Sequence, residues 1–135
     1  MNLSGRSVRT IVNFYQLPLS ELLLVHDDMN LPVGRLRIRR DGSAGGQKGL
    51  KNTIDQLGTP DFARLRIGVG RPSAGVNAAD YVLQKFSGSE RSVMESCVDR
   101  AASAIECWVC QGVDVAMNQY NQAISTDEQK DSEGV

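Results

Sequence analysis

Hydrophobic residues recur at intervals of three and four in several parts of the chain, which predicts helices there. The first predicted helix covers residues 4–16 and ends before Pro18. A second covers residues 48–57 and ends at Gly58. A short helix or turn is predicted over residues 77–83. A long helix with an apolar stripe follows it and ends at Gly112, and a last helix covers residues 113–123.

Three shorter segments have the pattern of β-strands. Residues 22–26 open with a continuous apolar run, which is typical of a buried strand. Residues 34–40 and 63–69 instead alternate apolar and polar positions, which places the two kinds of side chain on opposite faces. The alternation of strands and helices predicts an α/β domain over residues 1–123, followed by a polar, acidic and disordered tail over residues 124–135.

Composition agrees with one globular domain outside the membrane. The 135 residues are 41% hydrophobic and 23% charged, and no apolar run is long enough to span a bilayer. The single histidine, His26, excludes a multi-histidine metal site. Cys107 and Cys110 have the spacing of a metal or redox pair, but an ordinary helical role is favoured because a second pair and a nearby histidine are absent. Three cysteines on one helical stretch indicate reduced, cytosolic thiols.

Charge is distributed unevenly along the chain. The net charge is −1, yet residues 35–66 carry eight basic and three acidic residues, a local charge of +5. On the strand at 34–40, Arg35, Arg37 and Arg39 share one face, and guanidinium groups bind phosphate bidentately. On the strand at 63–69, Arg64 and Arg66 alternate with apolar residues and are expected to extend this basic face. The face indicates phosphate or nucleic-acid binding, and an ordinary solvated strand face is the alternative on charge alone.

The strongest chemical signal lies between the first two strands and the second helix. The apolar run ends at His26-Asp27-Asp28, a position where α/β sheets carry functional groups. A glycine-dense loop over residues 42–46 follows the basic strand, and its backbone can approach a ligand closely. An acid, a cationic strand and a flexible loop predict an anionic ligand together with hydrolytic or proton-transfer chemistry.

Several motifs together resemble one family. They are Met1-Asn-Leu-Ser-Gly, Val25-His-Asp-Asp-Met-Asn-Leu-Pro, Gly42-Ser-Ala-Gly-Gly-x-x-Gly-Leu, Leu57-Gly-Thr and Arg64-Leu-Arg-Ile-Gly-Val-Gly-Arg-Pro. Their order and spacing are similar to those of bacterial-type peptidyl-tRNA hydrolase, up to about Ala123. The resemblance implies a twisted mixed β-sheet flanked by helices. It also implies hydrolysis of the ester between a peptide and the tRNA 3′ end, with no metal and no organic cofactor.

The resemblance assigns roles to individual residues. Asp27 matches the acid that orients and polarises the catalytic histidine. Matches to substrate-binding positions are Met1, Asn2, Gly45 and Lys48. Matches to basic residues that bind tRNA phosphate are Arg37, Arg39 and Arg66.

Two departures from the family pattern affect these expectations. Gln47-Lys48 stands where the family commonly has His-Asn, and lysine donates but cannot accept a hydrogen bond. About the first third of the family pattern, which includes the general-base histidine, is expected to be absent from this N-terminally incomplete chain. His26 is interpreted as structural, with a hydrogen-bonding role near the site.

These departures predict a chain whose catalysis is impaired. Two readings of the short start are favoured, a misplaced gene start and a trimmed chain, over a true shortened relative. The full-length protein is expected to be a cytoplasmic monomer, and the shorter chain to be poorly stable or to associate through exposed apolar surface. The competing interpretations are an RNA-binding relative without catalysis and a subunit that pairs through its long C-terminal helix, including Trp108.

Overall fold

The computed structural model describes residues 4–71 and 88–122. Helix α1 (Ser4–Tyr15) and the short 3₁₀ helix η1 (Leu19–Glu21) precede strand β1 (Leu23–Asp28). Strand β2 (Leu36–Arg39), helix α2 (Lys48–Leu57) and strand β3 (Ala63–Gly68) follow. Helices α4 (Gly88–Gln111) and α5 (Val113–Tyr120) complete the described chain. Met1, Asn2, the turn predicted at 77–83 and the tail over 124–135 lie outside the described residues.

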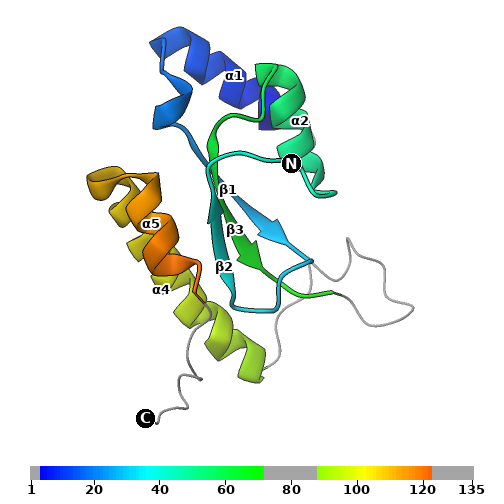
Figure 1. Cartoon of the computed structure of the whole chain (residues 1–135). Helices are drawn as coiled ribbons and strands as arrows, with labels where there is room; N and C mark the ends of the chain where they lie inside the picture. Colours follow the sequence, from blue (N-terminus) through cyan, green and yellow to red (C-terminus); the bar gives the residue numbers. More distant parts are fainter. Residues whose placement is uncertain (1–3, 72–87, 123–135) are drawn as a thin grey trace.

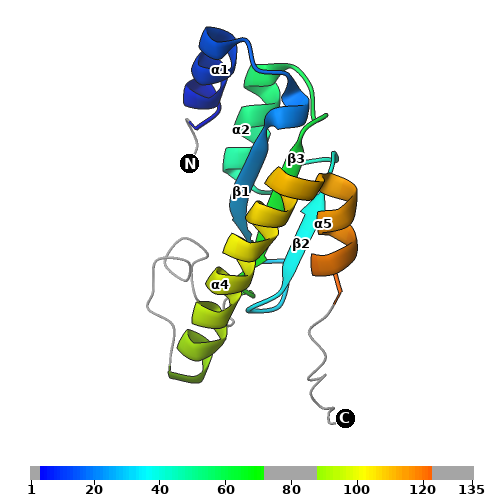
Figure 2. The same cartoon turned by 90° about the vertical axis from the view of Figure 1, so that its left-hand side faces the viewer.

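The three described strands form a mixed sheet in the order β1-β3-β2. β1 pairs with β3 in parallel, and β2 pairs with β3 antiparallel. Figures 1 and 2 show α4 and α5 together over one face of this sheet, while α1 and α2 pack against each other on the far side of β1. The predicted α/β class with a mixed sheet and flanking helices is confirmed. The limits of the domain stay a prediction.

The hydrophobic core lies between the sheet and the two C-terminal helices. Leu36 and Ile38 on β2 and Leu65 on β3 are at most 1% exposed. They pack with small residues on the helices, namely Cys97, Ala101, Ala104 and Cys107 on α4 and Ala116 on α5. Small side chains let helices approach the sheet closely. Trp108 is half-buried and packs against this cluster.

Two residues hold neighbouring elements at short range. Gly5 of α1 packs closely against α2, where a Cβ atom on Gly5 would lie 2.5 Å from the carbonyl oxygen of Asn52.

Asn121, just after α5, makes two hydrogen bonds to the backbone of β2 through its side-chain amide, as a paired strand would. Its Oδ1 accepts from the Ile38 N–H at 2.6 Å, and its Nδ2 donates to the Ile38 carbonyl at 2.9 Å. This pair satisfies backbone groups on the outer edge of β2.

Strand β1 ends two residues later than the sequence pattern predicts. The pattern ends at His26, where the apolar run stops, whereas the pairing with β3 continues through Asp27 and Asp28. The strand continues because Asp28 is neutralised by Arg66 on β3, as described below. α2 matches its predicted bounds, and Gly58 at its end has φ +78°, the left-handed conformation that glycine adopts most easily.

Candidate active site

Asp27 lies near the C-terminal end of β1, beside the start of α2. Its Oδ1 accepts a hydrogen bond from Nε2 of Gln47 at 2.8 Å. Gln47 is the N-cap residue of α2, and its Oε1 accepts from the Leu50 N–H at 2.8 Å. A single amide side chain therefore connects the acid on β1 to the beginning of the helix.

Asp28 points to a different partner. Its Oδ2 accepts from Arg66 Nε at 2.6 Å and lies 2.5 Å from Arg66 Nη2, while its Oδ1 accepts from the Asn30 N–H at 2.7 Å. The Asp28 side chain is 8% exposed and that of Arg66 is 22% exposed. Two adjacent carboxylates thus have separate environments, one held by a neutral amide and the other by a guanidinium.

A row of arginines crosses the sheet on the face opposite α4 and α5. Arg37 lies opposite Arg66, and Arg39 lies opposite Arg64 in the antiparallel register. Arg39 is exposed, and Arg37 is half-buried with an Nε that has no hydrogen-bond partner within the described chain. The predicted separation of faces on β2 is confirmed, because Leu36 and Ile38 are buried on the other side.

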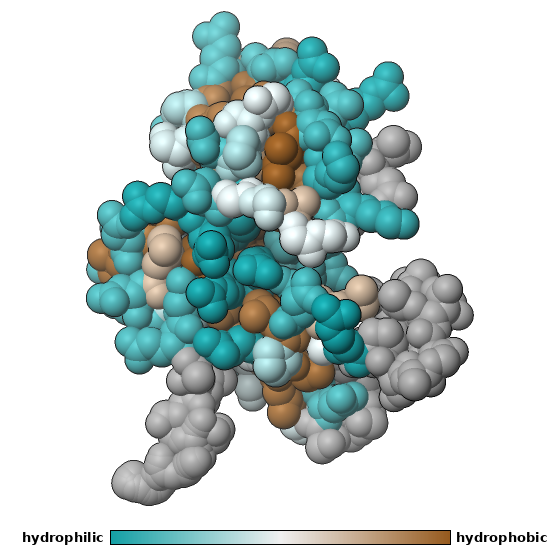
Figure 3. Space-filling model, turned by 45° about the vertical axis from the view of Figure 1, so that its right-hand side comes forward, coloured by the Kyte–Doolittle hydropathy of each residue, from teal (hydrophilic) through white to brown (hydrophobic). Residues whose placement is uncertain are grey.

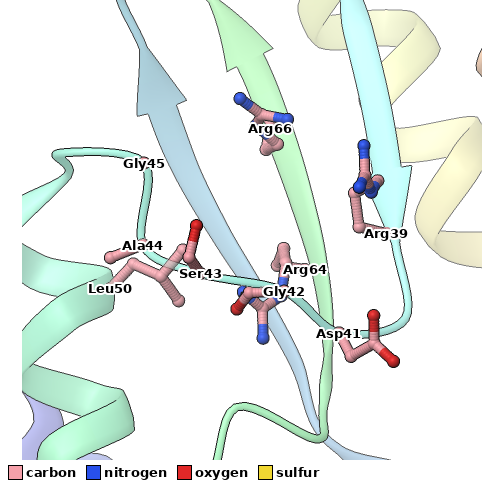
Figure 4. Close-up of a pocket in the computed structure, with 9 residues that line it drawn as sticks. All are labelled: Arg39, Asp41, Gly42, Ser43, Ala44, Gly45, Leu50, Arg64 and Arg66. Carbon is pink, nitrogen blue, oxygen red and sulfur yellow. The ribbon is translucent and has the colours of Figure 1, made fainter.

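A small hollow connects this row to the glycine-dense loop. It has a volume of about 100 Å³, and Figure 4 shows Arg39 and Arg66 beside the loop that crosses from Asp41 to Gly45. Gly45 and Gly46 have φ +58° and +88°, which a residue with a Cβ rarely adopts. The hollow combines guanidinium groups with a close backbone, so its chemistry suits a small anionic group.

Arg64 does not extend the basic face, and that expectation is wrong. Its side chain is 1% exposed. The guanidinium donates to the carbonyls of Phe62, Gly42 and Pro60 and lies 4.6 Å from the centre of the Phe62 ring. Burial lowers the pKa of this guanidinium from its ordinary value. Arg64 therefore ties the glycine-dense loop to the start of β3 instead of facing a ligand.

His26 is buried within the sheet. It is 4% exposed, and its Nδ1 lies 2.8 Å from the carbonyl oxygen of Asp27, so we assign that nitrogen as the donor. Burial is the main cause that lowers the pKa of His26 below its usual 6.5. The geometry agrees with a structural role close to the site.

Within the described chain, the remaining predicted site residues, Gly45 and Lys48, lie at or just before the start of α2. Lys48 is exposed at the first position of α2. The Gly45 carbonyl accepts from Asn30 Nδ2 at 3.4 Å. Sequence reasoning missed the roles of Gln47, Asn30 and Asp28, although the position of Gln47 directly before a predicted helix marks an N-cap.

Within 4–71 and 88–122, no group of three or more His, Cys, Asp or Glu side chains could hold a metal ion. Cys107 is buried and Cys110 is exposed, which agrees with an ordinary helical role.

Among residues 4–71 and 88–122, none of the helices has the length and apolar character that crossing a membrane requires. Figure 3 shows a mostly hydrophilic surface, interrupted by separate apolar patches, on the side where α2 lies.

The mixed sheet, the half-buried acid Asp27 beside the start of α2 and the arginine row define an α/β protein with a polar site whose chemistry suits an anionic group. Residues 1–130 match the family model described as peptidyl-tRNA hydrolase. The chain belongs to the peptidyl-tRNA hydrolase family.

Relatives and solved structures agree with this assignment. A peptidyl-tRNA hydrolase of Syntrophomonas wolfei is 54% identical over 90% of this chain and 65% of its own length. One from Rhodopirellula baltica is 50% identical over 93% of this chain and 66% of its own length. The crystal structure of peptidyl-tRNA hydrolase from Acinetobacter baumannii has a TM-score of 0.81 and 36% identity, covering 90% of this chain and 61% of that chain.

The chain thus spans just under two thirds of the length of the curated relatives. None of these comparisons supports the expectation that about the first third of the family pattern is absent, and it stays a prediction.

Proposed function

We propose that this chain takes part in hydrolysis of the ester bond of peptidyl-tRNA, which releases free tRNA and peptide. The observation that carries the proposal is the family match over residues 1–130, joined to a site that combines an acid with an arginine row. Hydrolysis of such an ester requires a base that activates water and donors for the developing negative charge.

Asp27 is the acid that orients the catalytic groups in this proposal. Its position supports the role, because its carboxylate lies at the end of β1 beside the glycine-dense loop and is held by Gln47. Gly45, Lys48, Met1 and Asn2 contact the peptide or the 3′ end of the tRNA.

Arg37, Arg39 and Arg66 bind tRNA phosphate. The exposure of Arg39 and the partial exposure of Arg37 support this role. Part of the Arg66 guanidinium is already bound to Asp28. We therefore assign the larger electrostatic contribution to phosphate binding to Arg37 and Arg39.

His26 does not act as the general base. It is the single histidine of the chain, is 4% exposed, and uses Nδ1 for the Asp27 carbonyl. A base must reach the water that it activates. Since loss of general-base catalysis costs a factor of about 10² to 10⁴, we infer that this chain acting alone hydrolyses its substrate slowly.

The reaction as proposed uses no metal and no organic cofactor, and its setting is the cytoplasm, where peptidyl-tRNA is produced. Association between copies of the chain is supported by exposed apolar side chains, of which Phe14 is 77% and Tyr15 is 65% exposed.

The test is release of an N-acetylated amino acid from tRNA, measured with and without added imidazole. The proposal predicts slow hydrolysis that imidazole accelerates, and the same rate for His26→Gln. Loss of hydrolysis in His26→Gln, at unchanged stability and tRNA affinity, would show that His26 is the base.

The second candidate is tRNA binding without catalysis, and the exposed guanidinium of Arg39 favours it equally. It predicts no hydrolysis with or without imidazole, but binding that weakens steeply as salt increases. Arg39→Gln should reduce the salt slope by about 1. The matched control is Arg9→Gln, because Arg9 is also exposed but lies on α1, away from the arginine row.

A further inference from the structure

The side chain of Gln47 connects Asp27 to the first turn of α2. Nε2 donates to Asp27 Oδ1 and Oε1 accepts from the Leu50 N–H, each at 2.8 Å. These two bonds fix the orientation of the amide. In the flipped orientation the oxygen would face a carboxylate and the NH₂ group would face an N–H donor.

The backbone of Gln47 is anchored on both sides. Its N–H donates to the Ala44 carbonyl at 3.1 Å, and its carbonyl accepts from the Lys51 N–H at 3.0 Å. The preceding Gly45 and Gly46 adopt positive φ values, which turns the chain sharply into the helix. A side chain on such a rigid backbone holds its partner in one geometry.

The contact engages only one oxygen of the acid. Within the described chain, Oδ1 of Asp27 carries the bond from Gln47, and no hydrogen bond to Oδ2 is present. Asp28 next to it has both oxygens engaged by Arg66 and Asn30. Oδ2 of Asp27 therefore stays free to orient a reacting group, whereas Asp28 is committed to the fold.

We propose that Gln47 is the positioning residue of Asp27 and that it aims Oδ2 at the reacting groups through its hydrogen bond to Oδ1. The inference rests on the proposed function for its catalytic part. A carboxamide neither gains nor loses a proton near neutral pH, so Gln47 keeps the same donor and the same acceptor throughout that range.

Gln47→Glu separates this role from the role of Gln47 as a helix cap. Glutamate has nearly the same shape, and its carboxylate still accepts from the Leu50 N–H at the helix N-terminus, where negative charge is favourable. It cannot donate to Asp27 and instead places a second carboxylate beside it. A cap alone predicts little effect of this change, whereas the positioning role predicts a catalytic loss.

Gln56→Glu is the matched control, because it is the same substitution on the same helix and Gln56 acts as an acceptor from Arg9. For Gln47→Glu we expect kcat to fall roughly 10- to 100-fold. We expect the urea midpoint to fall, because the new carboxylate repels Asp27, and tRNA affinity to change much less than kcat. Wild-type kcat in Gln47→Glu, under conditions where the wild type turns over, would overturn the proposal.

A spectroscopic measurement tests the contact without turnover. The side-chain NH₂ signals of Gln47 in a ¹⁵N-labelled protein should move in Asp27→Asn, and those of Gln56 should not. Unmoved Gln47 signals would overturn the proposal whatever the enzyme does. If the wild type hydrolyses no substrate but the Gln47 signals move, the proposed function fails while the positioning of Asp27 stands.

Discussion

Arg66 and Asp28 form an ion pair between neighbouring parallel strands, with Arg66 Nε 2.6 Å from Asp28 Oδ2. The pair lies directly beside Asp27, and both side chains are largely shielded from water. It explains how β1 can end on two successive carboxylates. One of them is neutralised within the sheet, and the other stays available at the site.

Asp28→Asn should lower the free energy of unfolding by about 2 kcal/mol, because it leaves a shielded guanidinium without its counter-charge. Urea unfolding measures the change. The control is Asp55→Asn, which removes the ion pair between Asp55 and Lys51. The Asp55 side chain is 60% exposed and the Lys51 side chain is 70% exposed. An exposed pair contributes little to stability. Equal effects of the two substitutions would contradict this explanation.

Arg64→Lys should also destabilise the protein, by roughly 2–3 kcal/mol, since an ammonium cannot reach the three carbonyls that the guanidinium bonds. The glycine-dense loop should then exchange its amide hydrogens faster, because Gly42 loses its link to Arg64. Arg39→Lys is the matched control on the paired strand, and we expect it to leave stability unchanged. The assignment of Arg64 as a structural residue is wrong if the two substitutions behave alike.

Asn121→Ala should cost roughly 1–2 kcal/mol, because it removes both hydrogen bonds to Ile38 on the edge of β2. It also uncovers backbone groups that can pair with another chain, so the variant should aggregate more readily. Thermal unfolding and light scattering measure the two effects. Asn118→Ala, at an exposed position of α5, should change neither.

Stability should fall with pH below about 6.5 because of His26. Its pKa in the folded protein is lowered by burial, so the unfolded chain binds a proton more readily than the folded chain does. The contribution of neutral His26 to stability is therefore complete above the unfolded pKa of about 6.5 and decreases as the pH falls towards the folded pKa. In urea titrations from pH 7.5 to 5, His26→Gln should lose less stability than the wild type. An identical loss in the two proteins would contradict the burial of His26 in its neutral form.

Local patterns in the sequence were sufficient to predict most elements. The spacing of Leu50, Ile54 and Leu57 and the glycine after them predict α2 correctly. The alternation of Leu36 and Ile38 with Arg37 and Arg39 predicts the two faces of β2. These features depend on neighbours along the chain, which the sequence displays directly.

Contacts between distant residues were not predictable in the same way. Arg64 alternates like Arg66, yet the segments at Gly42 and Pro60–Phe62 cover it, and alternation gives the face of a side chain but not what covers that face. Gln47 and Asp27 are 20 positions apart, and their hydrogen bond depends on the turn that glycine-dense backbone makes before α2. The candidate site was therefore proposed from motifs, whereas the partner that holds its acid is visible only in the fold.

The most direct test of the account compares Asp27→Asn with the wild type in hydrolysis of N-acetylated aminoacyl-tRNA, under the conditions where imidazole accelerates the reaction. We expect a rate lower by about 10² or more, at unchanged tRNA affinity and with Asp55→Asn at the wild-type rate. Wild-type hydrolysis by Asp27→Asn would show that the acid at the end of β1 does not serve the reaction, and the proposed site would be wrong.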